Sequence, residues 1–354
     1  MGKRSTSRGT LASLAAELGV SRTTVSNAYN RPDQLSPVLR ERILATAERL
    51  GYPGPDPAAR SLRTRRVGTV GVLFTDDLTY AFEDLASVDF LAGMAAASYG
   101  SHTALTLIPA GPGEDVNPQA LVGQSAVDGF VVYSVAEGDP YLTAAVARRV
   151  PVVVVDQPTT TDLPWVGIDD YHAIAPAAQA LLDAGHRHIG ILCIRLGRER
   201  NDGPVSPERL ASASLHVQKA RVEGALAVLA AGGIDPRHVP IVERHINDRA
   251  NNLDAARELL TAHPELTAVL CTTDSMALAV LDYRPDISVT GFDGISTALY
   301  RELTTVIQPN HDKGAAAGRM LGALIDANLA DTSIDLPNTV LPTSFYAGST
   351  VRRI

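Results

Sequence analysis

The pattern of the chain changes near residue 67, and this change most strongly limits what the chain can fold into. Before residue 67, apolar residues recur at helical spacing over the expected helices Leu11–Leu18, Ser21–Tyr29 and Pro37–Leu50. After it, short apolar runs rich in β-branched residues alternate with Ala- and Leu-rich stretches. Such alternation is typical of parallel sheets whose two faces are covered by helices. The sequence therefore predicts a helical head followed by an α/β body.

The body contains too many strand–helix units for one small sheet. The expected strands are Thr69–Leu73, Thr103–Ile108, Gly129–Tyr133, Val152–Val155, Ile189–Ile194, Ala268–Cys271 and Ser288–Gly291. The expected helices include Ala173–Asp183, Lys219–Ala231 and Leu253–Thr261. Two doubly wound parallel-sheet subdomains are the natural division, with a ligand at the carboxyl ends of the strands.

Composition excludes several classes of protein. The 354 residues are 45% hydrophobic and 20% charged, which suits globular domains and not a disordered chain or a coiled coil. No window approaches the ~18 apolar residues of a membrane span, and the basic N-terminus has no apolar segment of a secretory signal. Cys193 and Cys271 lie in apolar strand runs, so we expect buried structural thiols. A cytoplasmic protein without a disulfide framework or a thiolate metal cluster is predicted.

The net charge of −8 conceals an asymmetry between the two parts. Residues 1–66 hold twelve Lys or Arg and five Asp or Glu, a balance of +7, and the rest of the chain has a balance of −15. A basic head on an acidic body suggests that the head binds a polyanion. A solvated basic surface without a partner is the alternative.

The stretch LASLAAELGVSRTTVSNAYN, residues 11–30, is typical of a helix-turn-helix. Ala15 is small where two helices pack closely, and Gly19 permits the positive φ of a tight turn. Ser21 can cap the second helix, and Val25 and Ala28 face a small core. The polar side chains between them then point outward from a helix that can enter a major groove. An ordinary helical hairpin is the alternative.

The third helix has clear start and stop signals. Ser36 is the expected N-cap, Pro37 the first helical residue, and Gly51 follows the end. Its expected apolar stripe consists of Val38, Ile43, Ala47 and Leu50.

Many segments of the chain resemble the LacI/GalR family of transcriptional regulators. The head contains TLASLAAELGVSRTTVSNAYN, LSPVLRERILATAERLGY and AARSLRTRRVGTVGVL. The body contains VDGFVVYS, VPVVVVDQP, VGIDD, LLDAGHRHIGIL, TDSMALAV, VTGFDG and LTTVIQP in the family's order. The resemblance implies a DNA-binding head, a hinge helix with its linker, and a ligand-sensing, dimerising body like periplasmic sugar-binding proteins. The implied boundaries are 1–56 for the head, 57–66 for the hinge and linker, and 67–354 for the body, whose N-subdomain would comprise 67–169 and 308–336 and its C-subdomain 170–307 and 337–354.

The resemblance also implies a function. The chain would be a sequence-specific regulator, a repressor that binds a palindromic operator in double-stranded DNA as a homodimer. A small hydroxyl-rich effector, a sugar or a nucleoside, would modulate it. No catalysis, cofactor, metal or membrane contact is implied.

Residue-by-residue matching assigns the DNA contacts. Arg22, Thr23 and Asn27 match positions that read base edges, and Arg22 is the strongest candidate because Arg is the commonest bidentate partner of guanine. The positions that match phosphate contacts are Thr10, Ser21, Thr24, Ser26 and Asn30. The positions that match the minor-groove hinge helix are Ala58, Ala59 and Leu62, where Leu62 would be the apolar wedge. The preceding PGPDP, with three prolines, makes the linker about one residue longer than the family pattern.

The same matching places polar residues at or beside a cleft in the body. They are Asp156, Arg221, Thr273, Asp274, Asp293 and Gln308. Carboxylates and a guanidinium around a cleft suit hydroxyl-rich ligands. The alternative is that each charge is a structural partner at a strand end.

The sequence departs from the family in two further ways. The stretch after Asp274 is roughly eight to ten residues short, which we interpret as a trimmed helix, and Thr273 and Ala347 stand where Asn and Arg are usual.

A solute-binding receptor and an α/β enzyme are the competing functions. The basic head argues against the first, and the lack of a nucleophile elbow, a phosphate loop or a His-Glu-x-x-His motif argues against the second. His186 and His188 are more consistent with a turn than with a metal site.

Overall fold

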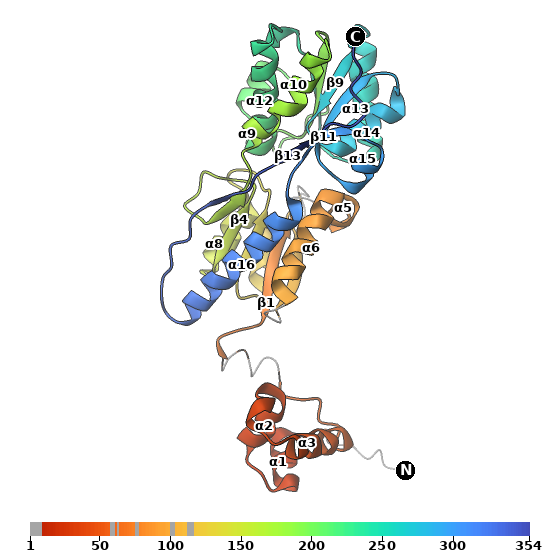
Figure 1. Ribbon diagram of the computed structural model, residues 1–354. Helices are drawn as coiled ribbons and strands as arrows, with labels where there is room; N and C mark the ends of the chain where they lie inside the picture. Colours follow the sequence, from red (N-terminus) through yellow and green to blue (C-terminus); the bar gives the residue numbers. More distant parts are fainter. Residues whose placement is uncertain (1–8, 57–60, 62–63, 75–77, 100–102, 112–116) are drawn as a thin grey trace, which may run out of the picture. The chain divides into compact units, whose positions relative to one another are not determined.

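The chain divides into two compact units, Met1–Val67 and Gly68–Ile354. The computed structural model describes residues 9–56, 61, 64–74, 78–99, 103–111 and 117–354. The first unit is a helical head and the second an α/β body (Figure 1). Each has its own hydrophobic core. The predicted fold class, with a helix-turn-helix head and two sheet subdomains, is confirmed.

The head consists of three α-helices whose first residues are set by side-chain caps. Thr10, Ser21 and Ser36 each accept a hydrogen bond from the backbone N–H three residues later. Gly19 has φ +67° and makes the tight turn between the first two helices. The elements are α1 (Leu11–Leu18), α2 (Arg22–Asn30), the 3-10 turn η1 (Pro32–Gln34) and α3 (Pro37–Arg49).

A small apolar core holds the three helices together. Its buried members are Leu14, Ala15, Leu18, Val25, Ala28, Ile43 and Ala47. The expected stripe of α3 is wrong at Val38, which is 77% exposed. Leu39 packs against the core instead, because it lies four residues before Ile43 and therefore on the same helix face.

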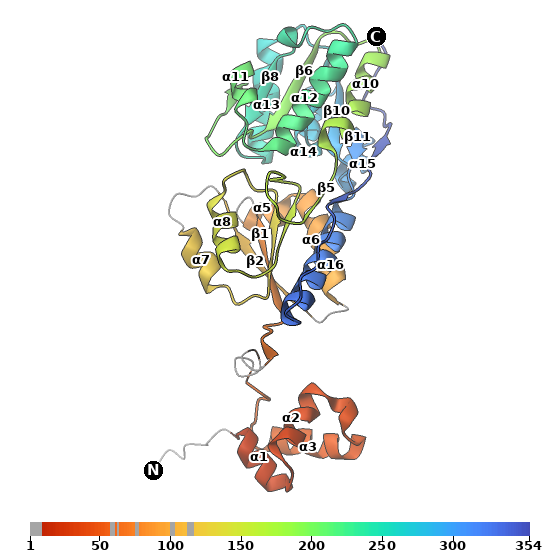
Figure 2. The ribbon, with the colours of Figure 1, turned by 90° about the vertical axis from the view of Figure 1, so that its left-hand side faces the viewer.

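The N-subdomain of the body is a six-stranded parallel sheet with helices on both faces (Figure 2). Helices α6 and α16 cover one face through a core that includes Phe90 and Leu321. Helices α7 and α8 cover the other through Val122 and Leu142. The strand order is β12-β5-β4-β3-β1-β2, with β1 (Thr69–Phe74), β2 (Ala104–Pro109), β3 (Phe130–Tyr133), β4 (Val152–Val155), β5 (Trp165–Gly167) and β12 (Thr339–Val340). The helices are α5 (Leu78–Glu83), α6 (Leu85–Tyr99), α7 (Pro118–Gln124), α8 (Pro140–Ala147) and α16 (Asn310–Leu329).

The C-subdomain is a seven-stranded sheet that departs from the parallel expectation at both edges. Strand β13 is antiparallel to β11, and β7 is antiparallel to β8. The strand order is β13-β11-β10-β9-β6-β8-β7, with β6 (Ile189–Ile194), β7 (Gly203–Pro204), β8 (Ile241–Arg244), β9 (Ala268–Cys271), β10 (Ser288–Asp293), β11 (Thr304–Ile307) and β13 (Ser344–Tyr346). Each edge strand pairs on one side only, so its direction does not affect the parallel strands inside the sheet.

Helices cover both faces of this second sheet as well. The expected helix over 173–183 is divided at Ile174, because Pro176 lacks the N–H that a continuous helix needs. The elements are α9 (Asp170–Ala173), α10 (Ala175–Asp183), α11 (Pro207–Ala211), α12 (His216–Ala231), η2 (Pro236–His238), α13 (Arg249–Ala262), α14 (Asp274–Tyr283) and α15 (Ser296–Tyr300). The segment expected to have lost a helix retains α14, and only residues 284–287 connect it to β10.

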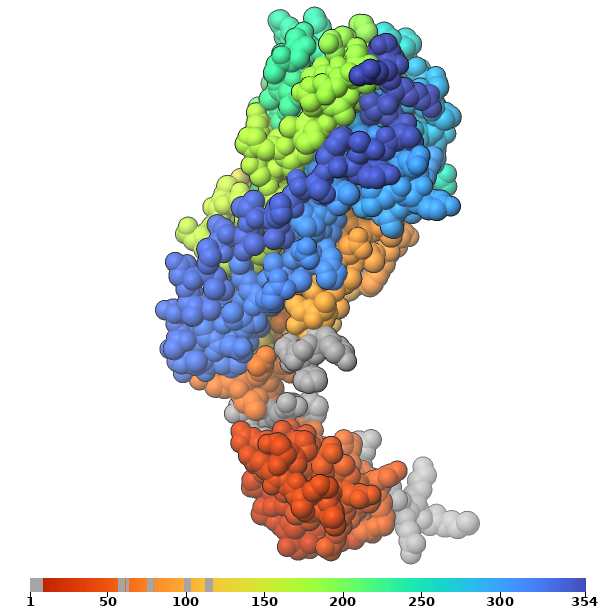
Figure 3. Space-filling model, in the orientation of Figure 1, coloured from red at the N-terminus to blue at the C-terminus, as the bar shows by residue number. Residues whose placement is uncertain are grey.

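Three segments of the chain pass between the two subdomains. They follow β5, β11 and β12. In Figure 3 the blue C-terminal residues run as one band along both subdomains. The last of these passages comes after Val340 and not at residue 337, since β12 pairs with β5 in the first sheet.

Candidate DNA-reading face and ligand cleft

The outward face of α2 presents the polar residues that the sequence assigns to base reading. Arg22 and Thr23 are exposed in the first turn, and Asn27 follows on the next turn, half-buried. Among the described residues, Arg22 has no hydrogen bond or ion pair, so its five donors are available to a ligand. The Asn27 amide donates to Gln34 Oε1 at 3.2 Å, which orients it from η1.

Three of the five residues matched to phosphate contacts lie at helix N-termini, whereas Ser26 and Asn30 lie farther along α2. Thr10 caps α1 in a reciprocal arrangement with Ser13, and Ser21 caps α2 and lies 2.8 Å from the Thr24 hydroxyl. Asn30 donates to the Ser26 hydroxyl and carbonyl. Helix N-termini have unsatisfied N–H groups and a positive dipole end, so the positions of Thr10, Ser21 and Thr24 suit phosphate oxygens.

The hinge residues Ala58, Ala59 and Leu62 lie outside the described residues. Elsewhere in the head, two arginines already have internal partners. Arg49 forms an ion pair with Glu17, and Arg40 donates to the Ala28 carbonyl. The free Arg22 therefore differs from these arginines, which support the fold of the head.

In the body, a pocket lies between the two subdomains at the carboxyl ends of their strands. The lining residues from the N-subdomain are Phe74, Asp84, Ala86, Ser87, Tyr133, Ser134, Asp156 and Gln157. Those from the C-subdomain and the β11–α16 passage are Ile194, Arg195, Leu215, Val217, Gln218, Arg221, Asn247, Thr273, Asp293 and Gln308. This is the position expected for a ligand in doubly wound sheets.

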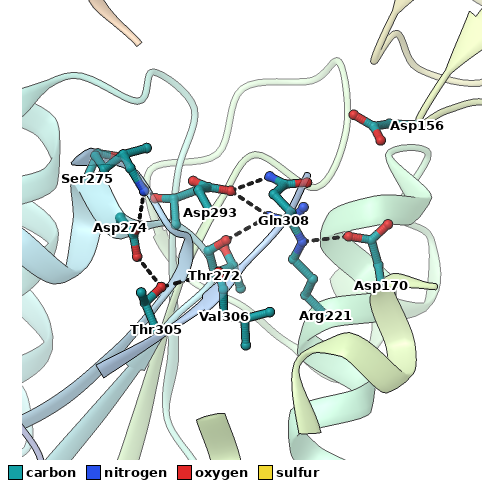
Figure 4. A network of polar contacts seen from close by, with 12 residues as sticks. Asp156, Asp170, Arg221, Thr272, Asp274, Ser275, Asp293, Thr305, Val306 and Gln308 are labelled. Atoms are coloured by element: carbon teal, nitrogen blue, oxygen red, sulfur yellow. Dashed lines mark hydrogen bonds and ion pairs between the residues drawn. The ribbon is translucent and has the colours of Figure 1, made fainter. Parts of the chain in front are cut away.

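Arg221 is the centre of a buried polar network on the C-subdomain side (Figure 4). Its Nε donates to Asp170 Oδ1 at 2.8 Å and its Nη1 to the Thr272 carbonyl at 2.9 Å. Nη1 also lies 3.5 Å from Asp293 Oδ1, and the guanidinium lies 3.8 Å from the centroid of the Phe292 ring. The structure thus brings together Arg221 and Asp293, which the sequence predicted separately.

Gln308 connects this network to the other subdomain. Its Nε2 donates to Asp293 Oδ1 at 2.6 Å, and its Oε1 accepts from Lys313 Nζ at 2.8 Å. Lys313 also donates to both carboxylate oxygens of Asp156 at 2.9 Å. Asp156 and Gln308, one on each side of the pocket, are therefore joined through a single lysine.

Sequence reasoning missed Lys313, although a signal was present. Lys313 is three residues after the buried Asn310 and four before the buried Ala317, on the face of α16 that continues through Leu321. A lysine on the buried stripe of a helix is rare unless it is paired, which predicts a buried partner.

Thr273 and Asp274 are neighbours in the sequence but differ in their position relative to the pocket. Thr273 caps α14 and lines the pocket. Asp274 is not a lining residue, and it accepts hydrogen bonds from the Ile295 N–H at 2.9 Å and the Thr305 hydroxyl at 2.5 Å. Its carboxylate therefore braces the loop after β10 behind the pocket, which corresponds to the structural alternative. Ala347 is exposed beyond β13.

Burial raises the pKa values of three carboxyl groups in this region. It raises the pKa of the Asp293 carboxyl well above its ordinary value and that of Asp170 above its own, against the opposing effect of Arg221. Burial also raises the pKa of Asp274 to about 6. These acids are paired with cations or hydrogen-bond donors inside the protein.

The remaining residues that could suggest chemistry are structural. The His186 ring is buried and contacts Thr267 Oγ1 at 2.9 Å and the Arg352 carbonyl at 3.0 Å. Cys193 and Cys271 are buried, as predicted, and burial raises the pKa of both thiols. Within the described part of the chain, no group of His, Cys, Asp or Glu side chains is arranged to hold a metal ion, and no helix is long and apolar enough to cross a membrane.

Comparison with known proteins identifies relatives over the whole chain. The model of the periplasmic binding proteins and sugar-binding domain of the LacI family matches residues 68–339. The HTH-type transcriptional regulator IpsA of Corynebacterium glutamicum is 57% identical, over 98% of each chain. A crystal structure of a LacI-family transcriptional regulator from the same organism is 53% identical with a TM-score of 0.75, covering 98% of this chain and 99% of that one. The operator-bound Lac repressor dimer shares the fold at 20% identity and a TM-score of 0.74, over 98% of this chain and 100% of that one.

Proposed function

Because the chain belongs to the LacI family of transcriptional regulators, we propose that it is a cytoplasmic repressor that binds a palindromic operator as a homodimer and responds to a small hydroxyl-rich effector. The observation that carries the proposal is Arg22, exposed at the start of a capped helix and without a partner among the residues that the structure describes. A helix in this position can insert its first turn into the major groove, where a guanidinium reads guanine.

The size of the head supports a dimer. Three short helices around seven buried residues offer too small a surface for tight specific binding by one copy. Two heads on a symmetric site combine their contacts, and the half-site spacing then matches the twofold symmetry of the protein. The Lac repressor structure, in which a dimer of the same fold holds an operator, supports this arrangement.

The hydrogen-bond acceptors that line the pocket support a hydroxyl-rich effector such as a sugar or a nucleoside. Asp84, Asp156 and Asp293 contribute acceptor oxygens, while the guanidinium of Arg221 is compensated by Asp170 and Asp293. Ligand hydroxyls can donate to such oxygens, because a carboxylate oxygen only accepts hydrogen bonds. A related regulator binds cellobiose and another binds ribose in their solved structures, which agrees with a sugar.

Two binding measurements test the proposal. Against a pool of random-sequence duplexes, the logarithm of the affinity of the full chain should fall linearly with the logarithm of salt concentration, because phosphate contacts release counterions. A chain that begins at residue 68 should not bind, since it lacks the head. A panel of neutral sugars and nucleosides should contain a compound that raises the unfolding temperature of the full chain. Equal DNA binding by the two chains would contradict the proposal.

A further inference from the structure

Lys313 is a buried cation to which the proposals above give no role. None of its surface is exposed, near the start of α16. Its ammonium has three acceptors inside the protein, namely the two oxygens of Asp156 and the amide oxygen of Gln308. All three N–H bonds are therefore satisfied, and none is left for a ligand.

Stability alone does not explain such a residue. Removing an ammonium and a carboxylate from water costs more than their attraction returns in many proteins, and an apolar pair of similar volume is often as stable. Both partners of Lys313 line the ligand pocket, however, while Lys313 itself lies behind it. The contacts of Lys313 therefore fix two of the side chains that line the pocket, Asp156 and Gln308.

Lys313 determines which way the Gln308 amide faces. An ammonium only donates, so Gln308 must turn its oxygen toward Lys313. The amide nitrogen then faces Asp293, to which it donates at 2.6 Å. Without the lysine, a reversed amide would direct its oxygen at the Asp293 carboxylate.

The carboxylate that Lys313 holds belongs to a residue with an unusual backbone conformation. Asp156 has φ +64°, in the left-handed region that Asp and Asn tolerate better than most residues. Both of its carboxylate oxygens point at Nζ at the same distance of 2.9 Å. A symmetric contact of this kind fixes the plane of the carboxylate at the wall of the pocket.

We propose that Lys313 is the positioning residue of the effector pocket, which orients the Asp156 carboxylate and the Gln308 amide on the two sides of the cleft. The inference rests on the proposed function of that cleft. Through Gln308, the same lysine places Asp293 and hence its contact with Arg221.

Trp165, the only tryptophan of the chain, reports on this arrangement. Its indole N–H donates to the backbone carbonyl of Asp156 at 2.8 Å, and the side chain is buried. A displacement of Asp156 changes the surroundings of the indole, so the fluorescence of the folded protein follows the position of Asp156 without any ligand.

The test is a double-mutant cycle in the full chain with Lys313→Met, Asp156→Asn and the double variant. Lys313→Met preserves length and leaves the carboxylate buried without a partner, so the unfolding midpoint should fall by ~5–15 °C. Asn tolerates the left-handed backbone, so the double variant should recover at least half of this loss. The emission of folded Lys313→Met should shift, whereas Lys219→Met, a lysine that donates to the Ala211 carbonyl, should leave it unchanged.

A pH profile separates positioning from simple packing. In Lys313→Met the unpaired Asp156 carboxyl favours its neutral form, so the midpoint deficit should shrink as pH falls from 8 to 5 and grow as pH rises. The double variant lacks this carboxyl and should show no such trend. His216, Asp170 and Arg221 also face Asp156, and comparison with the parent subtracts their titration.

Three results would overturn the proposal. They are independent effects of the two substitutions, a double variant that unfolds as readily as Lys313→Met, and unchanged Trp165 emission in a destabilised Lys313→Met. None of these measurements uses DNA or an effector, so failure of this inference is distinct from failure of the proposed function.

Discussion

The candidate site residues of the head and those of the body are distributed along the chain in opposite ways. The candidate base-reading residues lie within six positions of one helix, from Arg22 to Asn27, and none is fully buried. The candidate ligand residues come from segments more than 150 positions apart, and Asp156 and Gln308 are both buried. The candidate DNA-reading face is therefore specified locally, whereas the candidate ligand pocket forms only when the body folds.

The comparison extends to energetics. The described part of the head has no buried charged side chain, while the body buries three cations, Arg195, Arg221 and Lys313, in or beside its pocket. Substitutions on the outer face of α2 should therefore change DNA affinity alone. Substitutions in the buried network should also change the free energy of unfolding, because they leave charges unpaired.

The largest effect is expected in the body. Arg221→Met leaves Asp170 and Asp293 without their cation and should lower the free energy of unfolding by ~3–5 kcal/mol. Denaturant titration followed by Trp165 fluorescence measures it, since this tryptophan lies in the body. Arg237→Met is the matched control, because Arg237 pairs with Asp235 on the surface, and it should leave the free energy of unfolding nearly unchanged. Equal losses would mean that burial does not distinguish the two arginines.

The second effect concerns the dependence of the head on the body. Residues 1–66 alone should bind the operator at least ~100-fold more weakly than the full chain, because a single head lacks the second half-site contact that dimerisation provides. Titration of both proteins at one salt concentration measures the ratio. Identical affinities would show that the body contributes nothing to DNA binding.

The third effect is confined to the head. Arg22→Ala should cost ~1–3 kcal/mol of binding free energy on the operator and relax preference at one base pair per half-site. The free energy of unfolding reported by Trp165 should be unchanged. A loss of the same size on every sequence variant would mean that Arg22 contacts phosphate and not a base.

The smallest expected effect is a dependence of the body's free energy of unfolding on pH. The pKa of Asp274 is raised to about 6 by burial, so the folded protein holds this proton more strongly than the unfolded chain. The contribution to stability is present at low pH and lost as pH rises through the folded pKa. Between pH 5 and 7 it amounts to about 1 kcal/mol. Parent and Asp274→Asn, compared by denaturant titration, should differ by this slope, and parallel pH profiles would contradict the assignment.

The same contrast explains what could be predicted from the sequence. Caps, the Gly19 turn and helical spacing act over a few residues, so the head was predicted almost to its ends. Val38 alone departs from the expected stripe, because it lies five residues before Ile43 and therefore on another face of α3. Short strands such as β5 and β8, and the antiparallel edges, depend on partners distant in the sequence, and the local pattern does not record them.

The candidate ligand site shows more clearly what cannot be predicted from the sequence. Arg221, Asp293 and Gln308 were each found by resemblance, but their mutual contacts follow from tertiary packing. The same resemblance places Asp274 among them, although its carboxylate accepts from Ile295 and Thr305. Position along the chain cannot show which way a buried carboxylate faces.

The central claim is that the exposed face of α2 reads DNA in a symmetric pair of heads. The most direct measurement is selection of bound duplexes from a random-sequence library by the full chain, followed by sequencing. The account predicts a twofold symmetric site whose half-sites are separated by about one helical turn or a multiple of it, and with Arg22→Ala the same site with one base pair relaxed in each half. Enrichment of no site, or of an asymmetric site that Arg22→Ala leaves unaltered, would contradict it.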